Sequence, residues 1–182
     1  TTAAQAEAQM QLWKTTVMDR LRDPSLSVIG NHDLWWGAAK GEEKSLALKH
    51  FAMPARFYAA NHGGWRFLLL DTFHAAGCEL DDEQWAWLET ELARDAAPTF
   101  VVTHAPILSA THFLEPGIEK GYAYNVPAGW SPKGVVRFRQ LFRKHPHVKL
   151  ALSGHMHTVD RVDVDTTSYL CGGAVSGAWW GG

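Results

Sequence analysis

The sequence predicts an α/β protein built on a mixed sheet or on two sheets. Short β-branched and apolar runs alternate with helical patterns through the middle of the chain, and two further strand-like runs close it. Of the 182 residues, 46% are hydrophobic and 20% are charged, which is ordinary for a chain that folds around a core. Three expected strands end directly in loops that carry His or Asn, and open α/β sheets place their sites at such strand ends.

The N-terminal half is expected to contain two helices, a short strand and a hairpin. Ala, Gln, Leu and Met recur at helical spacing until Asp23-Pro24 stops the pattern. Two apolar runs separated by Asn61-His62-Gly63-Gly64 are typical of a β-hairpin. The expected elements are a helix over 1–21, a strand over 25–29, a helix over 42–50 and strands over 56–60 and 65–70.

The C-terminal half alternates strands with two stronger helices. Asp81 is suited to cap a helix whose Trp85, Leu88 and Leu92 share one face. The irregular stretch 107–132 is rich in Gly, Pro and aromatic residues, and loops of that length in compact domains tend to be lids or binding loops. The expected elements are helices over 81–95 and 133–145 and strands over 99–103, 147–152, 158–164 and 168–171.

Composition excludes several classes of protein and favours a single domain over 1–182. The net charge is −2, and Lys and Arg cluster only between 137 and 144, so we expect no binding to duplex nucleic acid. No apolar run reaches membrane-spanning length. Cys78 and Cys171 do not form a C-x-x-C pair, which excludes a zinc knuckle or a thioredoxin-like motif and leaves open a disulfide or two thiols.

Three short polar motifs follow three expected strands. Imidazole nitrogens and amide oxygens are common ligands of divalent metals, and side chains at the ends of neighbouring strands converge. A single His beside Gly or Pro is more often a turn or core residue, so the joint occurrence carries the weight. The motifs are Gly30-Asn31-His32-Asp33, Thr103-His104-Ala105-Pro106 and Gly154-His155-Met156-His157.

In order, residue type and spacing, these motifs resemble the last three motifs of the calcineurin-like metallophosphoesterases. The resemblance extends from Ser27 to at least His157 and implies a two-sheet (αββα) sandwich whose N-terminal strands are absent. The final stretch 172–180 is similar to one found in secreted bacterial members, which implies an exported or periplasmic bacterial protein.

The resemblance implies a binuclear metal centre and a hydrolytic reaction. Asn31, His104 and His155 would bind one metal, and His157 would bind the other. Two ions such as Mn, Fe or Zn would bridge a hydroxide that attacks a phosphate mono- or diester. The expected partner is therefore a small organic phosphate ester, and the bound cations would attract it.

The resemblance also implies catalytic roles for the two residues after Asn31. His32 would contact the phosphoryl oxygens and protonate the leaving alkoxide. Asp33 would orient the His32 ring; the alternative is that Asp33 is a carboxylate that caps a turn.

The family pattern begins with D-x-H and G-D-x-x-D, and neither motif occurs in this sequence. All the matching ligands are uncharged, and two divalent ions about 3.5–4 Å apart repel by roughly 17–19 kcal/mol at an effective dielectric constant of 20. We therefore expect at most one metal in this chain alone, and little hydrolysis. Truncation at both ends is the simplest explanation. The alternatives are a degenerate, non-catalytic module that binds metal or phosphate, and a hydrolase with one metal.

Other residues are candidates for substrate binding. Trp35 and Trp36 follow the first motif, and more aromatic residues lie in 107–132; they either stack on an organic group or pack the loops. Asp71 follows an apolar strand and either lines the site or ends the strand in a turn. His112 either faces the substrate or lies on the surface.

Overall fold

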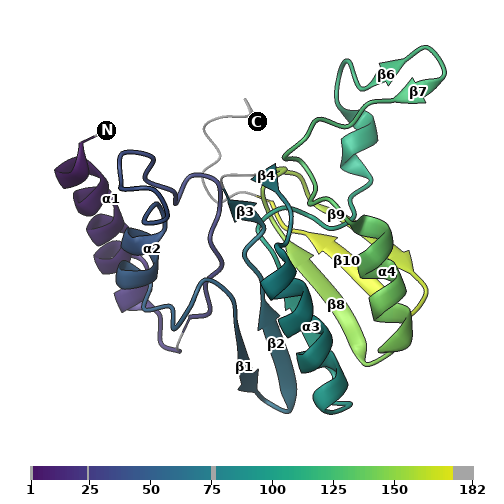
Figure 1. The fold of residues 1–182 in the computed structure, drawn as a ribbon, viewed down its shortest axis with the longest axis horizontal. Helices are drawn as coiled ribbons and strands as arrows, with labels where there is room; N and C mark the ends of the chain where they lie inside the picture. The colour runs from purple at the N-terminus through teal and green to yellow at the C-terminus, as the bar shows by residue number, and fades with distance from the viewer. Residues whose placement is uncertain (1, 24, 75–76, 174–182) are drawn as a thin grey trace.

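The computed structural model describes residues 2–23, 25–74 and 77–173, and its centre is a six-stranded mixed sheet (Figure 1). The strand order is β1-β2-β5-β8-β10-β9. The four inner strands are parallel, and each edge strand is antiparallel to its neighbour. The strands are β1 (Tyr58–His62), β2 (Trp65–Leu69), β5 (Thr99–Val102), β8 (Val148–Ser153), β9 (Asp160–Val164) and β10 (Thr167–Cys171). The expected α/β class is confirmed.

The predicted hairpin forms between β1 and β2. Tyr58 pairs with Leu69 and His62 with Trp65, so only Gly63 and Gly64 lie in the turn. Both glycines have positive φ, 58° and 79°, as a tight two-residue hairpin turn requires. The first strand therefore begins two residues later than the apolar pattern predicted.

Two helices cover one face of the sheet and bury its core. α3 (Asp82–Arg94) and α4 (Val135–Lys144) lie side by side on this face (Figure 1). Asp81 caps α3 as predicted, because its Oδ1 accepts a hydrogen bond from Gln84 N at 3.0 Å. Leu88 of α3, Val101 of β5 and Phe138 of α4 are fully buried in this core.

The described residues cover the opposite face of the sheet only in part. Trp65, Phe67 and Phe100 are half-buried there and contact one another, with ring centroids 4.8 and 5.0 Å apart. Of the two sheets that the resemblance implied, the described residues form one. The remaining strands pair as two ribbons, β3 (Phe73–His74) with β4 (Gly77–Cys78) and β6 (Glu119–Lys120) with β7 (Ala123–Tyr124).

The N-terminal helices pack on each other beside the sheet. They are α1 (Ala3–Thr16), the 3₁₀ turn η1 (Met18–Arg20) and α2 (Ser45–His50). Ile29, Ala47 and Phe51 form their small core, and Glu7 of α1 pairs with His50 of α2 at 2.9 Å. α2 is shorter than the predicted helix over 42–50.

The prediction of a strand over 25–29 was wrong. This segment is not assigned to any strand of the described sheets. Its backbone is bonded instead to a side chain: Tyr58 Oη accepts from Ser27 N at 3.0 Å and donates to Ser27 O at 2.9 Å. A β-branched run indicates an extended backbone, but strand formation also needs a neighbouring strand.

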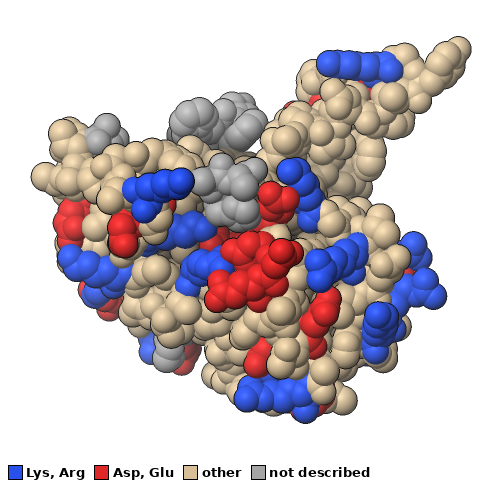
Figure 2. All heavy atoms as spheres, viewed as in Figure 1, with Lys and Arg blue, Asp and Glu red and all other residues tan. Residues whose placement is uncertain are grey.

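The segment 107–132 forms an arm that stands out from the body of the molecule (Figures 1 and 2). It carries the 3₁₀ turn η2 (Thr111–Leu114) and the β6–β7 ribbon, and Tyr122 between the two strands is fully exposed. On the face seen in Figure 2, acidic and basic side chains are interspersed. Within the described ranges, no helix combines the length and apolar character needed to cross a bilayer.

Candidate metal centre

Three of the four predicted ligands meet at the carboxyl end of the sheet. His104 Nε2 lies 2.9 Å from Asn31 Oδ1 and 3.2 Å from His155 Nδ1. His104 follows β5 and His155 follows β8, and these neighbouring parallel strands end at the same edge. We call Asn31, His104 and His155 the ligand cluster.

The spacing within the ligand cluster fits a shared cation. Metal–nitrogen bonds of about 2.0–2.1 Å at right angles place neighbouring donor atoms roughly 3 Å apart. The amide oxygen of Asn31 only accepts hydrogen bonds, so one N–H on His104 Nε2 cannot satisfy both of its neighbours. The three atoms therefore lie close enough together to share one cation.

Both imidazoles of the cluster are held in their neutral form. Burial, helped by the nearby His155, His32 and His157, lowers the pKa of His104 to about 4. Burial also lowers the pKa of His155, although a hydrogen bond to the backbone of Gly129 opposes this shift. Metal ligation requires neutral imidazole, and a second ring nitrogen bonded to a carbonyl is typical of ligating histidines.

Gly30 allows the ligand cluster to form, and the sequence patterns alone did not single it out. A β-carbon at this position would lie 2.8 Å from Nδ1 and Cε1 of His104. The main chain just before Asn31 therefore passes directly against the His104 ring. Phe73 supports the rings from another side, with its centroid 5.6 Å from that of His104 and 5.3 Å from that of His155. Gly30 opens the first motif, and a glycine directly before the ligand Asn31 was the available signal for such a close approach. No signal in the sequence indicated the role of Phe73.

His157 lies near the ligand cluster. Its charge contributes to the lowered pKa of both His104 and His155. His155 and His157 both have positive φ, 70° and 57°, which is uncommon for non-glycine residues and marks the turn that separates their side chains. Among the residues that the structure describes, no three His, Cys, Asp or Glu side chains gather as a metal site.

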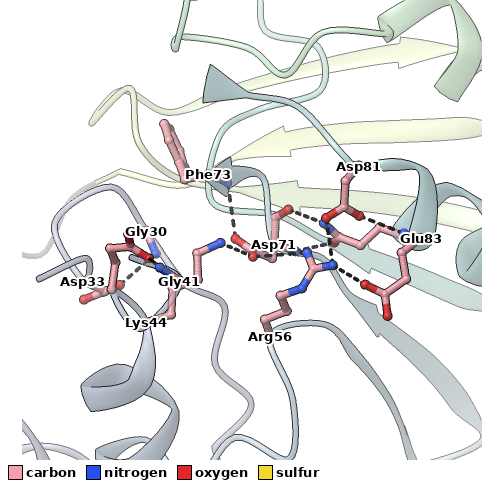
Figure 3. A network of polar contacts seen from close by, with 11 residues as sticks. Gly30, Asp33, Gly41, Lys44, Arg56, Asp71, Phe73, Asp81 and Glu83 are labelled. Atoms are coloured by element: carbon pink, nitrogen blue, oxygen red, sulfur yellow. Dashed lines mark hydrogen bonds and ion pairs between the residues drawn. The ribbon is translucent and has the colours of Figure 1, made fainter. Parts of the chain in front are cut away.

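His32 and Asp33 occupy different positions at the end of the first motif. His32 is exposed and lines a cleft together with Asp33 and His104. The carboxylate of Asp33 turns back to its own loop, where Oδ2 accepts from Gly30 N at 2.8 Å (Figure 3). Burial raises the pKa of Asp33, while this hydrogen bond and the charge of His32 oppose the shift. In this geometry Asp33 caps a turn and acts on His32 through its charge.

Asp71 lies at the centre of a polar network (Figure 3) rather than on an open surface. It is completely buried and forms an ion pair with Lys44, and Arg56 Nη1 lies 3.6 Å from its Oδ2. Asp71 Oδ1 accepts from Phe73 N at 3.3 Å, and its backbone pairs twice with the Gln84 side chain. Asp71 thus holds the loop that carries Phe73, whose ring contacts those of His104 and His155.

The two tryptophans after the first motif differ in their environments. The indole of Trp35 packs over Gly37, where a β-carbon would lie 2.9 Å from the ring. The Trp36 side chain is 63% exposed and lines a cleft next to Asn31. Trp35 therefore packs its own loop, whereas Trp36 is available to a ligand.

His112 is buried at the base of the arm rather than on the surface. The residue is only 4% exposed, and its ring lies 6.0 Å from that of Trp130. Its Nε2 is buried and has no hydrogen-bond partner among the described residues. Burial lowers the pKa of His112, and a backbone hydrogen bond with Trp130 and the charge of Asp160 oppose this shift.

The two tryptophans of the final stretch 172–180, Trp179 and Trp180, lie outside the described residues.

The fold and the ligand cluster define an α/β protein with a metal-type donor set at the ends of parallel strands. The family model of the calcineurin-like phosphoesterases matches residues 4–159. The chain belongs to that family.

Two relatives illustrate the similarity. The chain is 25% identical over 150 residues to a probable cyclic nucleotide phosphodiesterase of a Synechococcus strain, a match that covers 76% of the chain and 51% of that protein. The fold is similar to that of a purple acid phosphatase from yellow lupin seeds, with a TM-score of 0.57, 21% identity, and coverage of 86% of this chain and 29% of that one. The chain thus spans about half the length of its curated relative.

Proposed function

We propose that this chain is a metal-dependent phosphoesterase domain for a phosphate mono- or diester and that its ligand cluster binds one divalent cation. Without the D-x-H and G-D-x-x-D motifs, the chain alone would hydrolyse little. The observation that carries the proposal is that His104 Nε2 lies 2.9 Å from Asn31 Oδ1 and 3.2 Å from His155 Nδ1. A bound cation would neutralise phosphate charge and make water a better nucleophile near neutral pH.

The residues of the chain would supply the remaining functions. His32 is exposed beside the cluster, where it can bind a phosphoryl oxygen and give a proton to the leaving alkoxide. Asp33 would hold the loop that carries His32 and stabilise its charged form. The buried, unpartnered Nε2 of His112 is a further candidate for contact with the substrate.

The neutral donor set supports one cation in this chain rather than two. Asn31, His104 and His155 bring no negative charge, so they offset poorly the repulsion between two divalent ions. His157 would bind a second cation only if carboxylate ligands were also present. The same observation favours a second candidate function, a module that binds metal and phosphate without catalysis.

Calorimetric titration with Mn²⁺ or Zn²⁺ tests the proposed site. We expect one tight ion per chain, lost in His104→Ala and kept in the matched control His157→Ala. Tight binding of two ions would refute the argument from charge, and equal loss in both variants would refute the assignment of the cluster.

An assay of bis(4-nitrophenyl) phosphate hydrolysis in the presence of Mn²⁺ distinguishes the two candidate functions, a phosphoesterase and a non-catalytic binding module. If the chain is an enzyme, His32→Gln lowers kcat about 10²-fold or more while metal stoichiometry stays at one. An unchanged rate in His32→Gln would remove His32 from the mechanism, and no turnover by the unaltered chain would favour the binding module.

A further inference from the structure

Two clefts border the ligand cluster, one lined in part by His104 and the other in part by Asn31. The His32 cleft is lined by His32, Asp33 and His104, with Trp13 and Phe51 farther out, and has a volume of about 650 Å³. The Trp36 cleft is lined by Asn31, Leu34, Trp36, Phe73, Cys78 and Lys133, among others, and has a volume of about 250 Å³. A phosphoryl group at the cluster would therefore have room for a substituent in each cleft.

The two clefts differ in chemistry. The His32 cleft contains the side chain proposed to protonate the leaving group, so the leaving substituent belongs there. The Trp36 cleft has no histidine or carboxylate among its described lining residues; it offers carbon surface from Trp36, Phe73 and Leu34. A monoester has one organic substituent and would leave this second cleft unused.

The walls of the Trp36 cleft suit a flat ring. The indole of Trp36 is 63% exposed, and Phe73 is held in place by its contacts with the rings of His104 and His155. Aromatic faces bind flat groups by stacking, and such contacts are sequence- and substituent-tolerant. The volume lies just below the range of about 300–1,000 Å³ typical of sites for drug-sized ligands, so it fits one ring better than an extended chain.

Lys133 adds a positive charge to the rim of this cleft. Its Nζ forms a 3.6 Å ion pair with Glu79 Oε2, and because its side chain is 69% exposed this pair is screened by solvent and can exchange for a contact with a ligand. The hydroxyl of Ser131, another lining residue, already donates to Pro106 O at 2.5 Å. Lys133 is therefore the side chain best placed to meet acceptor atoms of a ring.

We propose that the substrate is a phosphodiester whose retained organic group is an aryl or heteroaryl ring bound in the Trp36 cleft. The proposal rests on the function proposed above and adds the substrate class and the residue that selects it. Trp36 is a specificity-determining residue in this proposal, and Trp13 of the opposite cleft is its matched control, because it is also an exposed tryptophan that lines a cleft beside the cluster.

The test compares the binding of inorganic phosphate, methyl phosphate and phenyl phosphate to the Mn²⁺-loaded chain by calorimetry. We expect phenyl phosphate to bind about tenfold more tightly than methyl phosphate, a difference of about 1.4 kcal/mol, because its ring can stack on the aromatic wall of the Trp36 cleft. Trp36→Ala should reduce this ratio to below about threefold and leave the affinity for inorganic phosphate unchanged, which shows an intact cluster. Trp13→Ala should keep the ratio.

Each other outcome has a distinct meaning. A ratio near one in the unaltered chain, with inorganic phosphate still bound, overturns the ring-binding proposal and leaves the proposed phosphoesterase function intact. Loss of the ratio in Trp13→Ala and its retention in Trp36→Ala also overturns it, because the ring would then lie in the His32 cleft. Failure to bind any phosphate in the presence of Mn²⁺ contradicts the proposed function and the inference together.

Discussion

At Gly30 the backbone runs so close to the His104 ring that a single methyl group would displace it. The β-carbon of an alanine would lie 2.8 Å from two ring atoms, well inside van der Waals contact. The ring is a side chain and can move away, so the expected consequence is a distorted ligand cluster rather than an unfolded protein. A substitution at Gly30 should therefore change the geometry of the ligand cluster without unfolding the protein.

We predict that Gly30→Ala lowers the affinity for Mn²⁺ about tenfold or more, the size of effect seen when the support of a metal ligand is disturbed. Gly154→Ala is the matched control, because it also precedes a ligand motif and its β-carbon would meet nothing within 4 Å. Calorimetric titration of both variants measures the difference. Equal affinities would show that the His104 ring is not constrained by Gly30.

At the scale of elements, the start of α3 combines a helix cap with an ion pair. Asp81 Oδ1 accepts from Gln84 N at 3.0 Å, and its Oδ2 lies 2.8 Å from Arg56 Nη2. Both side chains are partly exposed, so the ion pair is screened by solvent and the cap should contribute more. α3 covers the core beneath the ligand cluster, and its N-terminus also places Gln84 against the backbone of Asp71.

We predict that Asp81→Ala lowers the free energy of unfolding by about 1 kcal/mol, whereas Asp81→Asn lowers it by only a few tenths, because Asn caps helices about as well as Asp. Urea denaturation of the two variants gives the comparison. A loss in Asp81→Asn as large as that in Asp81→Ala would assign the stabilisation to the ion pair instead.

At the scale of the whole molecule, the Lys44–Asp71 ion pair joins the N-terminal helices to the sheet. Lys44 immediately precedes α2, and Asp71 lies two residues beyond the end of β2 (Figures 1 and 3). Asp71 is fully buried and the Lys44 side chain is 15% exposed, so removal of one charge leaves the other poorly solvated. The same carboxylate accepts a hydrogen bond from Phe73 N, which couples the Lys44–Asp71 ion pair to the loop that packs against the ligand cluster.

We predict that Asp71→Asn lowers the free energy of unfolding by about 3 kcal/mol, and that adding Lys44→Met restores part of the loss by removing the unpaired ammonium. Arg139→Gln provides the control, since its ion pair with Asp165 joins side chains 54% and 31% exposed and should contribute less than about 1 kcal/mol. Equal losses in Asp71→Asn and Arg139→Gln, measured by urea denaturation, would contradict a structural role for the buried pair.

How much of this could be predicted from the sequence depended on the range of the interactions. Local patterns fixed the α/β class, the Gly63-Gly64 hairpin turn, the Asp81 cap and the positions of the motifs, because turns, caps and periodicity are set by neighbouring residues. The convergence of His104 and His155 could also be expected, since the parallel strands β5 and β8 end at one edge. Asn31 follows no strand of the described sheets, so its place beside His104 was decided by the tertiary structure.

Only the tertiary structure decided the rest. The run 25–29 is extended but pairs with the Tyr58 hydroxyl instead of a strand, Asp71 is a buried ion-pair partner, and Trp35 packs a loop while Trp36 is exposed. Each of these outcomes depends on which distant group lies opposite the residue, and a residue's type and neighbours do not specify its long-range partner.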